Sequence, residues 1–186
     1  MSIVRGDTCT CMLHRVAVLS VVLLCGCATG NRTALDHCGW APEHFEVAFP
    51  SDGWRYVVSL QDNGERHELY ERRFLFYSCR SEQVSTSSYL PTLVGAKPAT
   101  PDEVFRNVTN FLSQSSSLWV SAVERTDDAI TWEWSSPSQS GIEKIVSGAS
   151  GVYRLTYACR SASLSPKQRR TWVPVIKGAK LVRRAG

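Results

Sequence analysis

The chain has 186 residues, of which 43% are apolar and 20% are charged, and its formal net charge is +4. This length fits one ordinary domain and is short for two, and the composition excludes global disorder. The charge is unevenly placed: residues 27–165 hold 12 basic and 16 acidic residues, whereas residues 167–184 hold seven basic residues and no acidic one. We therefore expect a mildly acidic body that ends in a basic tail.

The first clear pattern is the stretch MLHRVAVLSVVLLCGC at residues 12–27. His14 and Arg15 precede an apolar run from Val16 to Leu24, and small residues follow it. The run is about half as long as the roughly 20 residues that a membrane-spanning helix needs. The pattern therefore predicts an export signal and not a permanent membrane span.

The end of this run, Leu24-Cys25-Gly26-Cys27, resembles the lipobox of bacterial lipoproteins. The resemblance implies cleavage after Gly26, diacylglycerol on the thiol of Cys27 and acylation of the new amino group. Two or more acyl chains anchor a protein stably, whereas one chain does so only marginally. Cys25 is a rival acceptor, but only Cys27 has both Leu and Gly at the required positions. The alternatives are a plain signal peptide cut near Ala28 and a buried N-terminal helix.

These features divide the chain into a signal peptide (1–26), a tether (27–40) and one domain (41–186) with the basic tail. Residues 1–11 place Asp7 in the basic region of the signal, so Met12 is a candidate for the true start. By analogy with enterobacterial sorting, Ala28 after the lipidated cysteine favours the outer membrane, with the domain facing the periplasm. Export excludes nucleic acid as a partner in practice.

The body begins with a β pattern. Aromatic and β-branched residues bounded by Pro and Gly predict strands at 44–50 and 53–60, and a third strand at 66–79 follows Asn63-Gly64, a strong hairpin signal. Residues 82–99 read as a loop that contains at most a short strand.

A helix is predicted at 100–115, with Thr100 as N-cap, Pro101 at the first position and Glu103 completing a capping box. Four strands follow, at 117–125, 129–136, 142–148 and 151–160. A second capping box at 165–168 starts another helix, in which Trp172, Val173 and Ile176 share one face and Pro174 kinks or shortens the helix.

The predicted fold is α+β: an antiparallel sheet of about six to seven strands with the two helices packed on one face. The element order hairpin, helix, meander, helix resembles the PsbP-like fold, which also occurs in the bacterial lipoprotein DcrB. This resemblance implies a fold and does not imply a function.

Two segments, LFYSCRS at 75–81 and LTYACRS at 155–161, agree at five of seven positions. Similar surroundings explain this better than duplication does. In an oxidising compartment, the body cysteines Cys38, Cys79 and Cys159 would form one disulfide. If the two segments are neighbouring strands, Cys79–Cys159 is the favoured pair; the alternatives are Cys38 bound to either strand, and three buried reduced thiols.

The sequence contains little that points to catalysis or to a bound cofactor. Asp36, His37, Cys38 and His44 could form a weak metal cluster, but their spacing matches no standard zinc pattern, so we predict no metal and no cofactor. Cys38 or Cys79 could pair with His67 as nucleophile and base, although nothing indicates that they are close.

Two further features have ordinary structural explanations. The glycine-rich SGASG at 147–151 lies between two predicted strands, which favours a turn over a phosphate cradle. Trp132 and Trp134 share a strand face, where core packing beneath a helix is favoured over a binding platform.

The basic tail has two interpretations. It contacts anionic lipid headgroups close to the anchor, or it is a solvated helix end whose cations complement the helix dipole. The residues concerned are Lys167, Arg169, Arg170, Lys177, Lys180, Arg183 and Arg184.

Taken together, the sequence predicts a bacterial envelope lipoprotein that is not an enzyme. Its expected partners are membrane lipid, through acylated Cys27, and another envelope protein, in a structural, assembly or interaction role. The alternative is a periplasmic ligand-binding module with a pocket between sheet and helices, and the least favoured reading is a cysteine-dependent enzyme.

Overall fold

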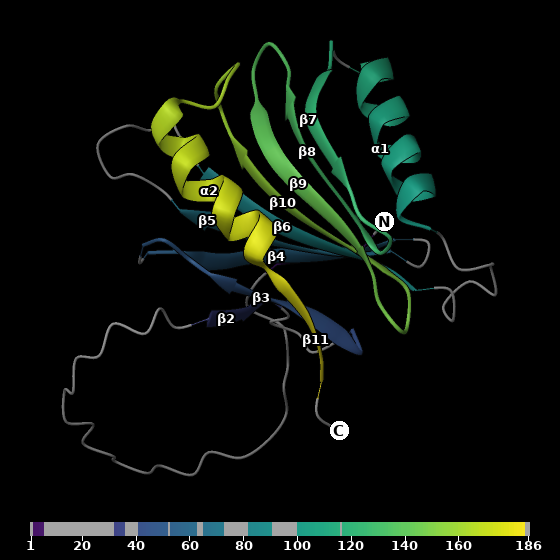
Figure 1. Ribbon diagram of the computed structural model, residues 1–186. Helices are drawn as coiled ribbons and strands as arrows, with labels where there is room; N and C mark the ends of the chain where they lie inside the picture. The colour runs from purple at the N-terminus through teal and green to yellow at the C-terminus, as the bar shows by residue number, and fades with distance from the viewer. Residues whose placement is uncertain are drawn as a thin grey trace, which may run out of the picture.

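The computed structural model describes residues 2–5, 32–35, 41–51, 53–62, 65–72, 82–90, 100–115 and 117–184. They form two β-sheets and two helices (Figure 1). In chain order the elements are β1 (Ser2–Arg5), β2 (Arg32–Leu35), β3 (Glu43–Ala48), β4 (Arg55–Asp62), β5 (Glu65–Arg72), β6 (Glu82–Tyr89), α1 (Pro101–Ser115), β7 (Trp119–Arg125), β8 (Ala129–Ser135), β9 (Ser140–Ser147), β10 (Val152–Cys159), α2 (Pro166–Gly178) and β11 (Lys180–Arg183).

The larger sheet has eight strands in the order β1-β4-β5-β6-β10-β9-β8-β7, and the smaller has three in the order β11-β3-β2. The strand pairs in both sheets are antiparallel. The predicted α+β class with an antiparallel sheet is confirmed. The second sheet is an addition that the sequence analysis does not predict.

The hairpin predicted around Asn63-Gly64 joins β4 to β5. Asp62 lies opposite Glu65 in the β4–β5 ladder, so only those two residues separate the strands. The two turn residues themselves lie outside the described residues. The strand predicted at 66–79 matches β5 as far as Arg72, and residues 73–80 lie outside the described ranges.

Strand β6 corrects the prediction of a loop at 82–99. It is eight residues long and lies inside the large sheet, paired with β5 on one side and β10 on the other. Its serines give little local preference for a strand. Ladder hydrogen bonds on both edges, together with the full burial of Val84, hold the segment extended.

Strand β2 corrects the description of 27–40 as a tether without regular structure. Four of those residues pair with β3, and Leu35 is buried opposite Phe45. A four-residue strand has too short a pattern to be recognised alone, and its partner β3 supplies the hydrogen bonds.

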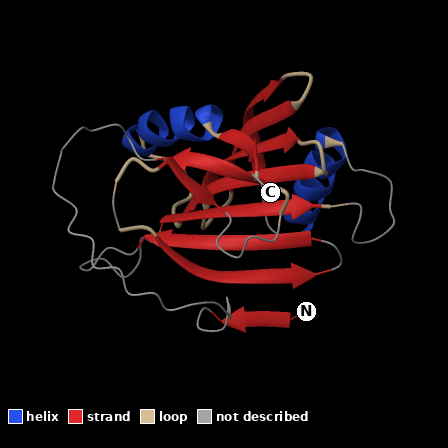
Figure 2. Ribbon diagram, turned by 90° about the horizontal axis from the view of Figure 1, so that it is seen from below, coloured by secondary structure: helices blue, strands red, loops and turns tan. Residues whose placement is uncertain are grey.

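The two helices cover opposite faces of the large sheet, and the expectation that both lie on one face is wrong. Trp172 of α2 packs in the same cluster as Ile142 of β9, whereas Val104 of α1 packs with Ile145 of β9. Residues three apart on a strand point to opposite faces. Figures 1 and 2 both show the helices well apart.

The smaller sheet packs on the same face of the large sheet as α2. Leu35, Phe45 and Val47 pack into the same cluster as Tyr70 and Tyr153 of the large sheet. The small sheet therefore covers the part of the α2 face that α2 leaves open, and α1 buries its own stripe on the other face.

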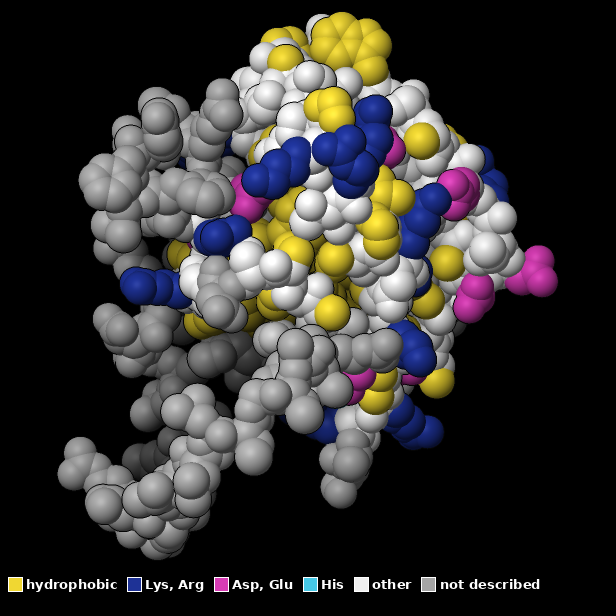
Figure 3. Space-filling view, turned by 60° about the vertical axis from the view of Figure 1, so that its left-hand side comes forward, with side chains coloured by type: hydrophobic (Ala, Val, Ile, Leu, Met, Phe, Trp, Pro, Cys, Tyr) yellow, Lys and Arg dark blue, Asp and Glu magenta, His cyan; other side chains and the backbone are white. Residues whose placement is uncertain are grey.

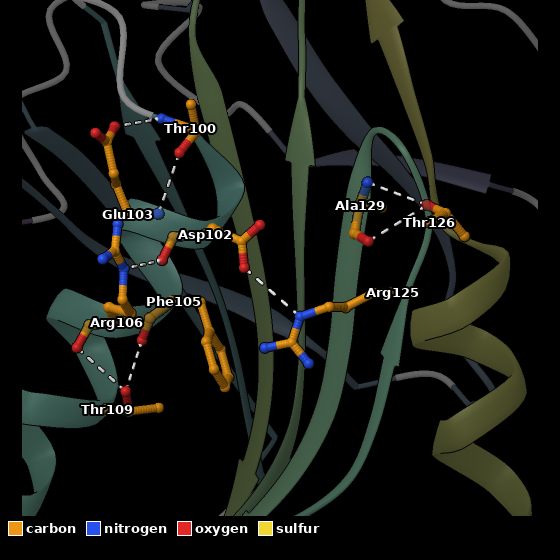
Figure 4. A network of polar contacts seen from close by, with 9 residues as sticks. All are labelled: Thr100, Asp102, Glu103, Phe105, Arg106, Thr109, Arg125, Thr126 and Ala129. Carbon is orange, nitrogen blue, oxygen red and sulfur yellow. Dashed lines mark hydrogen bonds and ion pairs between the residues drawn. The ribbon is translucent and has the colours of Figure 1, made fainter.

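Helix α1 begins as predicted (Figure 4). The Thr100 backbone N–H donates to Glu103 Oε2 at 2.8 Å, and the Glu103 N–H donates to Thr100 Oγ1 at 3.2 Å. Phe105 then packs edge-on against Trp132, with ring centroids 4.8 Å apart. Arg125 of β7 joins this contact, because its guanidinium lies 5.2 Å from the Phe105 ring centroid.

Helix α2 also begins at the predicted capping box, formed by Ser165 and Gln168. Pro174 does not end the helix, which continues to Gly178. A proline leaves the carbonyl four residues earlier without its helical N–H partner. Both Arg170 and Pro174 are exposed, so water can satisfy that carbonyl. Within the described residues, neither helix is long and apolar enough to cross a bilayer.

Candidate functional site

A small pocket lies between the two sheets. Its volume is about 30 Å³, which is room for roughly one or two water molecules. Leu35, Ala41 and Phe45 form its apolar part, and polar groups come from β3, β5, β6 and β10. The polar lining residues are Glu43, His44, Glu68, Thr86, Ser87, Ser88 and Tyr153.

The buried carboxylate of Glu43 is held by the glycine-rich turn between β9 and β10. The backbone N–H of Ala149 donates to Glu43 Oε1 at 3.0 Å, and the N–H of Ser150 donates to Oε2 at 3.1 Å. The predicted turn at 147–151 is thus confirmed. Its amides do bind an anion, as amides in such concave turns do, and the anion is a side chain of the protein itself.

The second acid of the pocket, Glu68, accepts a hydrogen bond of 2.8 Å from the Tyr70 hydroxyl. Glu68 is buried, as are the neighbouring serines of β6. His44 Nδ1 is buried and makes no hydrogen bond within the described part of the chain. These groups can order water between the sheets, whereas a drug-sized ligand needs a pocket of roughly 300 Å³ or more.

Cys159 is a buried free thiol in this structure. Its Sγ lies 3.5 Å from Ser140 Oγ on β9. Burial raises the pKa of the thiol, and Glu82 raises it further, although the hydrogen bond with Ser140 acts in the other direction. A thiol in such a setting is a poor nucleophile at neutral pH.

The first repeat segment, 75–81, lies outside the described residues, and the second overlaps β10. Residues 152–159 of β10 pair with β6 along one edge and with β9 along the other. Glu82 lies opposite Cys159 in the ladder, and Cys79 is three residues before Glu82. Cys38 and Cys79 lie outside the described residues, so the pairing itself stays a prediction.

The Tyr of the second repeat segment, Tyr157, belongs to a polar contact at the start of α2. Its hydroxyl donates to Glu82 Oε1 at 2.8 Å and accepts a longer bond of 3.4 Å from Gln168 Nε2. Burial, followed by the charge of Glu82, raises the pKa of Tyr157, so the phenol stays protonated. The ring also stacks on Trp172, with centroids 4.1 Å apart. This constellation is structural, because it joins β10 to α2.

Sequence reasoning missed a buried ion pair on the α1 face of the large sheet. Arg154 Nη2 donates to Glu143 Oε2 at 2.7 Å, and Thr156 Oγ1 donates to the same oxygen at 3.1 Å. Burial by itself lowers the pKa of Arg154, but the charge and hydrogen bond of Glu143 outweigh it and raise that pKa. Each residue lies in a strand that mixes polar and apolar residues, so the sequence pattern does not single it out. Only the β9–β10 register brings the two together.

The seven basic residues of the predicted tail do not form one group. Arg169 donates to Glu133 at 2.9 Å, and Lys177 pairs with Glu124, in both cases across the surface. Lys167 and Arg170 are exposed near the start of α2. Figure 3 turns the α2 side forward and shows Lys and Arg side chains along it. The remaining three, Lys180, Arg183 and Arg184, are exposed on and after β11.

The structure describes both tryptophans of the suggested binding platform and one residue of the suggested metal cluster. Trp132 and Trp134 are buried beneath α1, which confirms the prediction of core packing. In the metal candidate, His44 lies on β3, whereas Asp36, His37 and Cys38 lie outside the described residues. The described residues contain no group of three or more metal-ligating side chains. Cys27, Gly26 and the rest of the lipobox also fall outside the described ranges.

Exposed large apolar side chains occur near the end of α1 and along β7. They are Phe111, which is 69% exposed, Trp119, which is 58% exposed, and Val120 and Val123. All seven residues of β7 are exposed, and β7 is the last strand of its sheet. Figure 3 shows apolar side chains at the top of the molecule, where this end lies in Figure 1. We call these four residues the apolar end.

No protein-family model matches this chain, and no curated protein matches it significantly in sequence.

Proposed function

We propose that this chain is a bacterial envelope lipoprotein, anchored through lipid on Cys27, whose folded domain serves a structural, assembly or interaction role. The observation that carries the proposal is the order Leu24-Cys25-Gly26-Cys27 at the end of a short apolar run. An apolar run of this length ends an export signal, and the glycine before the cysteine suits lipidation. Ala28 favours the outer membrane as its location.

The position of the folded body supports an anchor at this place. Strand β2 begins at Arg32, so four residues separate it from Cys27. A lipidated cysteine would thus be joined directly to the domain, with no long linker, and β1 would be removed with the signal peptide.

The apolar end supports the interaction role. Large exposed apolar patches on a folded domain often mark contact sites for proteins or membranes. Trp119 and Phe111 are exposed aromatic side chains, and large aromatic side chains, tryptophan above all, often anchor protein interfaces. The partner we expect is another envelope protein.

Lipidation is tested by mass spectrometry of the N-terminal peptide from membrane-extracted protein. We expect a peptide that starts at Cys27 and carries diacylglycerol and an acyl group. Cys27→Ser should remove the lipid and prevent this processing, whereas the matched control Cys25→Ser should keep both. A mature peptide that starts after residue 27 without lipid would contradict the proposal.

The interaction role is tested by photocrosslinking in intact envelopes, with a photoreactive residue at Val120. We expect a defined crosslinked protein that is absent when the residue is placed at Ser163, an exposed loop position. Equal labelling at both positions would mean that the apolar end is not an interface.

A further inference from the structure

The inference concerns which surface of the domain touches the membrane, and it rests on the proposed lipidation of Cys27. Strands β2, β3 and β11 form one sheet with β3 in the middle. Neighbouring strands are about 4.8 Å apart, so β2 and β11 lie about 10 Å apart. In register, Arg32 lies opposite Ala48 at one end of β3, and Lys180 lies opposite Glu46 two residues away.

Chain length keeps this sheet close to the anchor. Five residue steps lead from Cys27 to Arg32, and an extended chain covers at most about 3.6 Å in each step. Arg32 therefore lies within about 18 Å of the lipidated residue. The headgroup region of one leaflet is itself about 5–8 Å deep, so the small sheet has little room to move away from it.

Charge adds a second, independent argument. Lys180 shares the outer face of the small sheet with Glu46, whereas Arg183 shares the inner face with Glu43, and Arg184 is exposed just after β11. The acids facing them across the ladder are Glu46 and Glu43. The Glu43 carboxylate is buried and bonded to the β9–β10 turn, and Glu46 is half-buried. Among the described charged residues at this outer face, the cations Lys180 and Arg184 outnumber the acid Glu46.

The other basic residues are placed differently. Lys167 and Arg170 lie near the beginning of α2, and that helix of 13 residues is about 20 Å long. Figure 1 places the C-terminal end of the chain and the small sheet at the bottom, opposite the top end where α1 finishes. The apolar end therefore points away from the surface that carries Lys180 and its neighbours.

We propose that the outer side of the small sheet, with Ala34, Ala48 and Lys180, and Arg184 just beyond it, lies on anionic phospholipid headgroups. The acyl chains on Cys27 hold the protein to the bilayer, and Lys180 and Arg184 set its orientation. The apolar end then faces the periplasm, where a protein partner can reach it.

The test uses the lipidated protein extracted from membranes and reconstituted in phosphatidylcholine vesicles with and without phosphatidylglycerol. A photoreactive residue replaces Ala48 in one variant and Val120 in the other, since both positions are exposed. We expect crosslinks to lipid from position 48 at least severalfold more often than from position 120, and more often with phosphatidylglycerol present. Equal yields, or a higher yield at 120, would overturn the proposal.

A pair of charge variants separates orientation from anchoring. Each cation near an anionic surface contributes a factor of roughly five in binding. The double variant Lys180→Gln/Arg184→Gln should therefore lower the crosslinking at position 48 by about fivefold or more. Lys167→Gln/Arg170→Gln removes the same charge and should change it less than about twofold, because these residues lie roughly a helix length away.

The failures of the two proposals can be told apart by mass spectrometry of the reconstituted protein. A Cys27 without lipid overturns the proposed function and this orientation with it. If Cys27 is lipidated but the probe at position 48 crosslinks to lipid no better than the probe at position 120, the orientation alone is overturned. Equal effects of the two charge variants would also overturn the orientation, because the net charge of the protein would then explain the crosslinking without any particular basic residue facing the lipid.

Discussion

Glu43 Oε1 accepts a hydrogen bond of 3.0 Å from the backbone N–H of Ala149, a residue 106 positions further along the chain. This bond, with its partner from Ser150, joins the small sheet to the β9–β10 hairpin of the large sheet. Glu43 also lines the pocket between them. Its removal should therefore loosen the small sheet, and with it the surface proposed to face the membrane.

We expect Glu43→Ala to lower the free energy of unfolding by about 2–4 kcal/mol, because two backbone amides lose a charged acceptor in part-buried hydrogen bonds. Urea denaturation followed by tryptophan fluorescence measures the change. The matched control is Glu46→Ala on the same strand, half-buried, with an expected loss below about 1 kcal/mol. Equal losses for the two variants would show that the turn does not depend on Glu43.

Gly148→Ala should be destabilising by about 2 kcal/mol or more, as overpacking in a closed site is. A Cβ at this position would lie 2.3 Å from Glu43 Oε2 and 2.7 Å from Cε2 of Tyr153. Thermal unfolding of the variant provides the measurement. Gly178→Ala is the control, since a Cβ there would meet nothing within 4 Å. An unchanged melting temperature for Gly148→Ala would contradict the close packing of this turn.

The Glu143–Arg154 pair should behave as a buried pair in which each charge needs the other. Glu143→Gln and Arg154→Met should each cost about 3–5 kcal/mol, because each leaves one charge without its partner. The double variant should cost clearly less than the two losses added together. Chemical denaturation of the four proteins completes the cycle. Strict additivity would mean that the two side chains do not interact.

Cys159 should make stability fall at alkaline pH. Burial raises the pKa of this thiol above its ordinary value of 9.0, so the native chain stays protonated while the unfolded chain ionises. The unfolded state then binds fewer protons, and the free energy of unfolding decreases as the pH rises above 9.0. Below that pH the thiol is protonated in both states and contributes no slope.

The measurement compares Cys159→Ser with the unmodified chain in urea at pH 8 and at pH 10. The difference between the two proteins isolates the thiol, since Tyr157, whose pKa is also raised, and Lys144, whose pKa burial lowers, are common to both. The variant should lose less stability over this interval. Peptide mapping after alkylation at neutral pH should also find Cys159 unmodified in the native protein. A larger loss in the variant would contradict the sign of the shift.

Local signals account for the elements that were predicted well. Thr100 with Glu103, and Ser165 with Gln168, satisfy helix N–H groups within three residues, so both helix starts could be located without knowledge of the fold. The hairpin at Asn63-Gly64 depends on two residues in the same way. Strands β7 to β10 follow the alternation of aromatic and β-branched residues, which is also local.

The missed features depend on partners far along the chain. Strand β6 has weak local preferences and is extended because β5 and β10 supply hydrogen bonds on both sides. The placement of the two helices on opposite faces depends on contacts between distant segments, Trp172 with the cluster of Ile142 and Val104 with that of Ile145. The same is true of Glu143 and Arg154, which meet only in the β9–β10 register.

The sequence by itself determined the class of the fold, the two capped helices, most strands and the lipobox-like segment, because each of these is written in residues that are neighbours along the chain. Only the tertiary structure decided that Glu43 fills the glycine-rich turn, that Cys159 is enclosed between two strands, and that the basic residues divide between α2 and β11. Those outcomes depend on which strands pair and in which register. Pairing is settled by the burial of side chains from distant segments together, which no local pattern specifies.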